Sequence, residues 1–146
     1  MFRTLRIVLA VVVGMLAGFW IIMAGQMLGQ KVYPPPPWLD IKDPASIGEA
    51  MKVIPTGALA IVLISWAVGT FIAAGIAARI APTWKIGQGM IVGVLFLLSG
   101  ISNMSMFPHP AWFWVVGVVE FLPAAYLGAK LCAGSESKVA SPADED

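Results

Sequence analysis

The chain has 146 residues, of which 59% are hydrophobic and only 12% are charged, and its formal net charge is +1. A soluble domain of this size carries about twice that share of charged residues, so the composition favours a single membrane-embedded unit. No basic patch points to nucleic acid, and no apolar run alternates with period two as a transmembrane barrel requires. The single cysteine, Cys132, excludes an internal disulfide and argues against a thiol–disulfide oxidoreductase.

Four apolar runs dominate the chain, and each approaches the ~20 residues that a helix needs to cross a bilayer. They cover residues 5–28, 55–80, 86–107 and 111–132. A longer loop, 30–54, joins the first two runs. The pattern predicts an all-α fold in which residues 1–132 form one four-helix transmembrane bundle. The acidic and Ser-rich stretch 133–146 predicts a disordered cytoplasmic tail.

The distribution of basic residues predicts the orientation. The first run follows two arginines but is too long for the apolar segment of a signal peptide, so we expect an uncleaved helix. Six basic residues fall on the side of the termini: Arg3, Arg6, Arg79, Lys85, Lys130 and Lys138. Three fall in the loop: Lys31, Lys42 and Lys52. This bias places both termini in the cytoplasm of a bacterial cell, with the protein in the inner membrane and the loop facing outward.

Small residues form a stripe along the first predicted helix. Four glycines follow one another at spacings of 4, 7 and 4: Gly14, Gly18, Gly25 and Gly29. At 3.6 residues per turn they lie on one side of the helix, where a neighbouring helix can approach closely. The neighbour is either a helix of the same chain or a second copy in a homodimer.

The outer loop combines a stiff segment with a short helix. Tyr33 and Trp38 flank four prolines, which predict a polyproline II rod. Asp43 is a good N-cap and Pro44 a good first helical residue, so an amphipathic helix is expected to follow on the outer surface. The proline segment is interpreted as a surface connector or as a docking site for a proline-binding partner.

The chain contains a faint internal repeat. A shift of 75 positions brings Gly14, Gly18 and Gly25 onto Gly89, Gly93 and Gly100. A shift of 51 positions brings the segment 73–81 onto 124–132. Because the two hairpins run in the same direction, this predicts a parallel two-plus-two repeat.

Away from their ends, the four apolar runs contain one charged residue, Glu120. This makes it the first candidate for function. It lies nine residues into the last run, roughly 13 Å from the outer helix end at 1.5 Å per residue. A carboxyl at this depth is expected to face the bundle interior, to carry its proton and to meet Ser65 and Ser99 at the same level. Pro123 leaves the carbonyl of Val119 without its usual donor. The group is read either as a proton or cation site or as an interhelical hydrogen bond.

Further polar residues lie nearer the outer surface. Gln26 falls at a similar depth to Ser102 and Asn103, and the three are read as the lining of an outward vestibule or as polar contacts between helices. His109 closes a Met-x-Met-x-x-His pattern whose ligand types suit Cu(I), although one imidazole and two thioethers do not make a preorganised metal site. We therefore assign no metal and read His109 as an interfacial residue.

Several segments resemble a family of small bacterial four-span membrane proteins. The resemblance rests on the Tyr-Pro-Pro-Pro loop at 33–36, the Asp-Pro pair at 43–44, Pro55-x-Gly57-Ala58, and Pro-His-Pro-x-Trp-Phe-Trp at 108–114. It covers residues 5–133 and implies an inner-membrane location without a known activity. Small multidrug-resistance transporters also have four helices and one membrane glutamate, but theirs lies in the first helix, so no residue is carried over from them.

The sequence contains no nucleophile–base pair and no phosphate-binding loop, and we expect no cofactor. The leading prediction is a non-enzymatic accessory or structural subunit that acts with the lipid bilayer, as a homodimer or within a larger membrane complex. The alternative is a small dimeric transporter or channel that moves protons or cations through Glu120. A membrane enzyme or metal handler at the Met/His turn is the second alternative.

Overall fold

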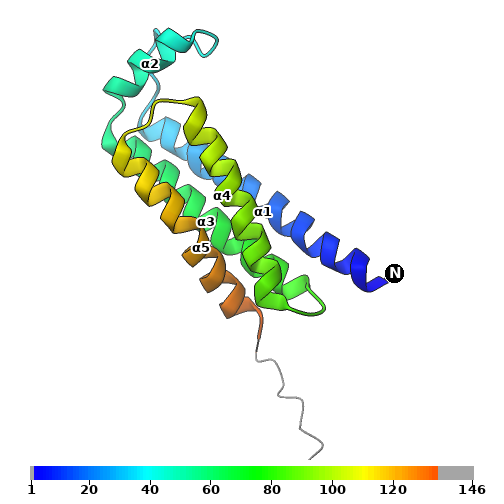
Figure 1. Cartoon of the computed structure of the whole chain (residues 1–146). Helices are drawn as coiled ribbons and strands as arrows, with labels where there is room; N and C mark the ends of the chain where they lie inside the picture. The colour runs from blue at the N-terminus through cyan, green and yellow to red at the C-terminus, as the bar shows by residue number, and fades with distance from the viewer. Residues whose placement is uncertain (1, 135–146) are drawn as a thin grey trace, which may run out of the picture.

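The computed structural model describes residues 2–134, and within them every regular element is an α-helix (Figure 1). The five helices are α1 (Phe2–Val32), α2 (Pro44–Val53), α3 (Thr56–Ile80), α4 (Lys85–Met106) and α5 (Ala111–Cys132). This confirms the predicted all-α bundle. Residues 135–146 of the tail predicted to be disordered lie outside the described part of the chain. Ala133, which the tail was predicted to include, is buried instead.

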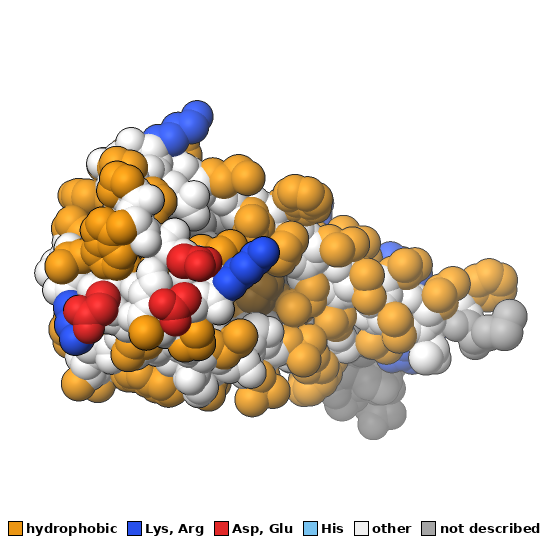
Figure 2. Space-filling model, turned by 90° about the horizontal axis from the view of Figure 1, so that it is seen from above, with side chains coloured by type: hydrophobic (Ala, Val, Ile, Leu, Met, Phe, Trp, Pro, Cys, Tyr) orange, Lys and Arg blue, Asp and Glu red, His pale blue; other side chains and the backbone are white. Residues whose placement is uncertain are grey.

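Four of these helices, α1, α3, α4 and α5, are long and apolar enough to cross a membrane, which indicates a multi-pass membrane protein. Figure 2 shows hydrophobic side chains covering the length of the molecule, while acidic side chains gather at one end. We call this end, which carries α2 and the preceding proline segment, the loop end. The opposite end, where Phe2 and Gly134 lie, is the terminal end.

Helix α3 is the central element of the bundle. It packs against α1, α4 and α5, and α5 also packs along α4. Helix α1 touches α4 but makes no contact with α5 in residues 2–134. At the centre, the Trp66 ring stacks on Phe121 and meets Phe113 edge-on, with centroids 5.6 Å apart in both pairs. These rings fill the space between α3 and α5, so a short polar contact between the two helices has little room there.

The glycine stripe of α1 packs against α3 of the same chain. A Cβ added to Gly14 would lie 2.6 Å from the carbonyl oxygen of Ala73, and one added to Gly18 would lie 2.7 Å from the Ala73 Cβ. Gly25 faces Ser65, and Gly29 faces Ile61 in the same way. Of the two interpretations offered by the sequence, the structure shows packing within the chain.

The second glycine pair makes equivalent contacts in the second hairpin. Gly89 faces Ala129 and Gly93 faces Ala125, both on α5. Each pair of glycines therefore meets alanines of the next long helix in the chain, as a repeat of hairpins would require. The arrangement is not symmetric, however, because α4 packs against α3 whereas α1 makes no contact with α5 within residues 2–134. The two-plus-two repeat stays a prediction.

The predicted loop helix is present and is capped as its sequence indicates. The carboxylate of Asp43 accepts hydrogen bonds from the backbone N–H groups of Ala45 (3.0 Å) and Ser46 (3.3 Å). Ala50 is buried, and Met51 and Ile54 pack against the main core. The apolar side of α2 therefore lies on the loop end of the bundle, which holds this helix above the four spans (Figure 1).

Basic side chains tie the terminal end together. Arg3 donates to the hydroxyl of Thr83 (3.1 Å), and Arg6 donates to the carbonyl of Ile80 (3.5 Å). Lys85 donates to the carbonyl of Ala133 at the end of α5 (2.9 Å). The last two contacts use carbonyls that helix ends leave free. Together the three contacts fix α1 and α5 to the short turn between α3 and α4.

Candidate functional site

Glu120 lies on α5 at the border between its buried and exposed sides. Gly117 and Phe121 on one side of it are buried, whereas Val116 and Val119 on the other are exposed. One carboxyl oxygen, Oε1, is enclosed and has no hydrogen-bond partner in residues 2–134. Buried polar groups are nearly always hydrogen-bonded, so an enclosed carboxyl oxygen without a partner among residues 2–134 makes Glu120 a candidate for function.

Pro123 places a second acceptor next to this carboxyl. Helix α5 continues through the proline, but proline has no N–H to give to the carbonyl four residues earlier, that of Val119. Val119 and Pro123 are both exposed. The side of α5 that carries Glu120 thus presents a carboxyl and a backbone carbonyl that lacks its usual helical donor.

The two serines predicted at the level of Glu120 do not bind it. The Ser65 hydroxyl donates to the carbonyl of Ile61 (2.7 Å), and the Ser99 hydroxyl donates to that of Leu95 (2.9 Å). Ser65 is buried on the side of α3 that faces Gly25 of α1, and Ser99 is exposed. These residues were grouped because they lie at the same depth along their helices. In the structure their side chains lie on different sides of those helices and do not meet.

The polar residues predicted nearer the loop end are also separated. Asn103 and Ser102 are exposed on α4. Gln26 is half-buried on α1 and lines a cavity to which neither of them contributes. The described residues therefore show no shared vestibule leading from Gln26 and Asn103 toward Glu120.

His109 is held within the turn between α4 and α5. Its ring stacks on Phe113 at a centroid distance of 4.5 Å, and Nδ1 lies 2.9 Å from the carbonyl oxygen of Phe107. Met104 is buried against Gly117, while Met106 is exposed. The two thioethers lie in different surroundings, so the Met/His pattern does not converge on one point.

Sequence reasoning missed two buried polar groups. The hydroxyl of Thr70, which is fully buried, and Oε1 of Gln88 have no hydrogen-bond partner among the described residues. Both lie on α3 or α4 within the bundle, and each is a polar residue in a mostly apolar run. A polar residue in an apolar run is visible in the sequence, but it does not indicate that its side chain will lack a hydrogen-bond partner.

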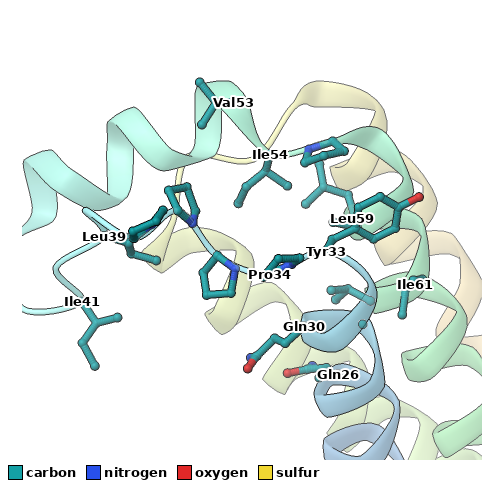
Figure 3. A pocket seen from close by; sticks show the side chains of 17 residues that line it. Gln26, Gln30, Tyr33, Pro34, Leu39, Ile41, Val53, Ile54, Leu59 and Ile61 are labelled. Atoms are coloured by element: carbon teal, nitrogen blue, oxygen red, sulfur yellow. The ribbon is translucent and has the colours of Figure 1, made fainter.

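A cavity at the loop end was not predicted from the sequence (Figure 3). It has a volume of about 760 Å³ and lies between the last turns of α1, the proline segment and the start of α3. Gln26 and Gln30 lie one turn apart on its α1 wall, and Figure 3 shows both side chains on the same side of that helix. The sequence drew attention to Gln26 and to the proline segment separately, but it did not indicate that they line one cavity.

No protein-family model matches the chain, and no curated protein or solved structure shows significant similarity to it. The resemblance to small bacterial four-span proteins thus stays a prediction. Function has to be argued from the residues of this chain alone.

Proposed function

We propose that the protein is a non-enzymatic subunit of a larger membrane assembly and that α5 forms the contact with its neighbour. The observation that supports this is the enclosed Oε1 of Glu120, which lacks a partner in residues 2–134. In hydrocarbon no water is available to satisfy such a group, and an unsatisfied polar group costs several kcal/mol. A polar side chain of a neighbouring helix would remove that cost.

The surroundings of Glu120 leave room for this neighbour. Helix α1 covers α3 but does not reach α5. The exposed side of α5 carries large apolar residues along its whole length: Trp112, Val115, Val116, Val119, Leu122, Tyr126, Leu127 and Leu131. Lipid alone suits these apolar residues, so they do not require a protein partner. The carboxyl beside them distinguishes this side from the rest of the lipid-facing surface.

We further propose the orientation in which both termini lie in the cytoplasm of a bacterial cell and the protein resides in the inner membrane. Arg3 and Arg6 bind the turn between α3 and α4 at the terminal end, and Lys85 binds the end of α5 there. This clustering supports the positive-inside orientation. The loop end, with α2, would then face outward.

The test is purification from the native membrane in a mild detergent, followed by native mass spectrometry. We expect a complex of fixed stoichiometry, either with a second protein or with a second copy. Glu120→Gln keeps a hydrogen-bonding side chain and should keep the complex, whereas Glu120→Leu should lower its yield roughly three- to tenfold, the effect of one interhelical hydrogen bond in a membrane. Val115→Leu, on the same exposed side, is the matched control and should have no effect.

The other outcomes decide against the proposal. A wild-type protein that is monomeric, or a Glu120→Leu variant that retains the full complex, would refute assembly through this carboxyl. A transporter that uses Glu120 requires flux in proteoliposomes that Glu120→Gln abolishes. That result would favour the transport alternative, because Gln keeps the hydrogen bond but cannot exchange a proton.

A further inference from the structure

The cavity at the loop end has walls that are mostly apolar. It is lined by the last turns of α1, the first turns of α3, and the segments that join α1 to α2 and α2 to α3. Its volume of about 760 Å³ falls within the ~300–1,000 Å³ range of sites that enclose one small molecule. The lining consists mainly of four successive prolines together with Leu39, Ile41, Ile54, Leu59 and Ile61. A ligand that fills this space must be largely hydrocarbon.

Two carboxamides supply the polar part of the lining. Gln26 and Gln30 both line the cavity from α1, and Figure 3 shows their side chains on the same side of that helix, below Pro34 and Ile54 in the view. Neither side chain makes a hydrogen bond with another described residue of the chain. A carboxamide both donates and accepts hydrogen bonds, so two of them can hold a hydroxyl or an ester group.

Charged side chains are excluded from this lining, although they are common nearby. The loop and α2 contain six of them: Lys31, Asp40, Lys42, Asp43, Glu49 and Lys52. None of these lines the cavity, and Glu49 pairs with Lys52 on the exposed side of α2. A phosphate or carboxylate placed among apolar walls without a cation would be costly to desolvate. The chemistry of the lining therefore selects an uncharged ligand.

The cavity lies where a membrane lipid can enter it. Helix α1 advances 20 residues from Arg6, which is anchored at the terminal end, to Gln26. That length is about 30 Å, the thickness of the hydrocarbon core. Gln26 thus falls at the boundary between hydrocarbon and headgroups, and the cavity extends from there toward α2.

The wall of the cavity is built to hold its shape. Four prolines restrict the backbone of the segment 34–37. The Tyr33 ring, which begins this segment, packs directly over Gly57 at the start of α3, where any side chain would displace it. A preformed cavity binds its ligand without the entropic cost of ordering the wall.

From these observations we infer that the cavity binds an uncharged single-chain lipid of the monoacylglycerol type, with its acyl chain against the prolines and isoleucines and its glycerol end on Gln26 and Gln30. This inference does not depend on the assembly role proposed for Glu120. It adds a lipid site at the loop end, to which Glu120 does not contribute.

The experiment uses the full chain in nanodiscs and a monoolein analogue that carries a photoreactive diazirine in its acyl chain. We expect crosslinks to fall on the lining residues, between positions 26 and 62, and unlabelled monoolein to compete with them. Oleate has the same chain with a carboxylate end, and it should compete at least tenfold less well. Equal competition by oleate would refute selection for an uncharged ligand.

Two sets of variants test separately how the apolar walls and the two carboxamides contribute to lipid binding. Ala58→Trp, which fills the cavity from α3, should abolish competable labelling, whereas Ile64→Trp, on an exposed position of the same helix outside the lining, should not. The double variant Gln26→Leu, Gln30→Leu should weaken competition by monoolein roughly tenfold, as expected for two lost hydrogen bonds in a membrane. Labelling spread over all lipid-facing helices without competition would show bulk lipid only. A lining that stays unlabelled by the diazirine probe would also overturn the inference.

Discussion

The close contact between α1 and α3 provides the sharpest test of the packing. In Gly14→Ala the new Cβ would lie 2.6 Å from the carbonyl oxygen of Ala73 and 3.2 Å from the Cβ of Ala77. The nearest obstacle is backbone, so no side chain can rotate away from it. A carbon and a carbonyl oxygen normally approach to about 3.3 Å, so α1 has to move outward by roughly 0.7 Å.

The cost of this movement follows from what holds membrane helices together. No hydrophobic effect drives them into contact within lipid, so dispersion across the interface supplies much of the stability. A gap of about 0.5–1 Å forfeits a quarter to a half of that attraction at each contact. We therefore expect Gly14→Ala to lower the free energy of unfolding by about 1–3 kcal/mol, the usual range for an overpacked site.

The measurement is equilibrium unfolding in mixed micelles with increasing sodium dodecyl sulfate, followed by circular dichroism. Gly48→Ala is the matched control because nothing lies within 4 Å of the added methyl group in α2, and there alanine should be neutral or stabilising by up to about 1 kcal/mol. Gly18→Ala displaces the same helix, so the double variant with Gly14→Ala should cost less than the sum. A Gly14→Ala protein as stable as Gly48→Ala would show that α1 does not pack on α3 in this way.

Three further predictions concern other parts of the chain. Asp43→Ala removes the cap of α2 and should cost about 1 kcal/mol locally, so that amide exchange over 44–53 becomes about fivefold faster. Asp43→Asn keeps a capping side chain and should change the exchange rate little. Unchanged exchange in Asp43→Ala would contradict the capping contact. Phe121→Ala empties the space against Trp66 and should lower the free energy of unfolding by about 3 kcal/mol or more in the same assay. Leu122 is partly exposed, so Leu122→Ala should cost far less. Equal losses would place Phe121 outside the core. Replacing Arg3 and Arg6 by Ser reduces the basic bias from six against three to four against three and should invert a measurable fraction of molecules. The inversion is detected with a reporter that is active only in the cytoplasm and is fused to the C-terminus. An inactive reporter on the wild-type protein would refute the proposed orientation.

The helices themselves could be predicted because a bilayer imposes length and hydropathy on each span. The run predicted at 111–132 coincides with α5, and the Asp43–Pro44 pair marked the start of α2 correctly. Helix α1 was predicted too short, because polar residues at both ends can continue a helix beyond the apolar run. It extends from Phe2 to Val32, and its arginines reach the turn at the terminal end.

The candidate site was harder to predict because a sequence gives depth along a helix but not the partner on each side. Ser65 was placed at the level of Glu120, yet it faces α1 and bonds to its own helix. A serine can always satisfy its hydroxyl on the carbonyl four residues earlier, so matching depth is weak evidence for a shared site. The cavity at the loop end was missed for a related reason. It arises from the way the proline segment returns over α1, and no local pattern encodes that path.

The α1 side and the α5 side of the bundle differ in whether their packing and polar groups have partners among the described residues. On the side of α1, glycines bring backbone against backbone and every member of the stripe already has its neighbour in α3. A second copy cannot use that surface without first displacing α1. On the side of α5, no helix within residues 2–134 covers the exposed face, and the enclosed oxygen of Glu120 has no partner in the described chain. Because a membrane helix gains little from apolar contact with protein instead of lipid, a single unsatisfied carboxyl can decide which side associates. This asymmetry leads us to expect that contacts between subunits form through α5 and that the glycine stripe of α1 takes no part in them.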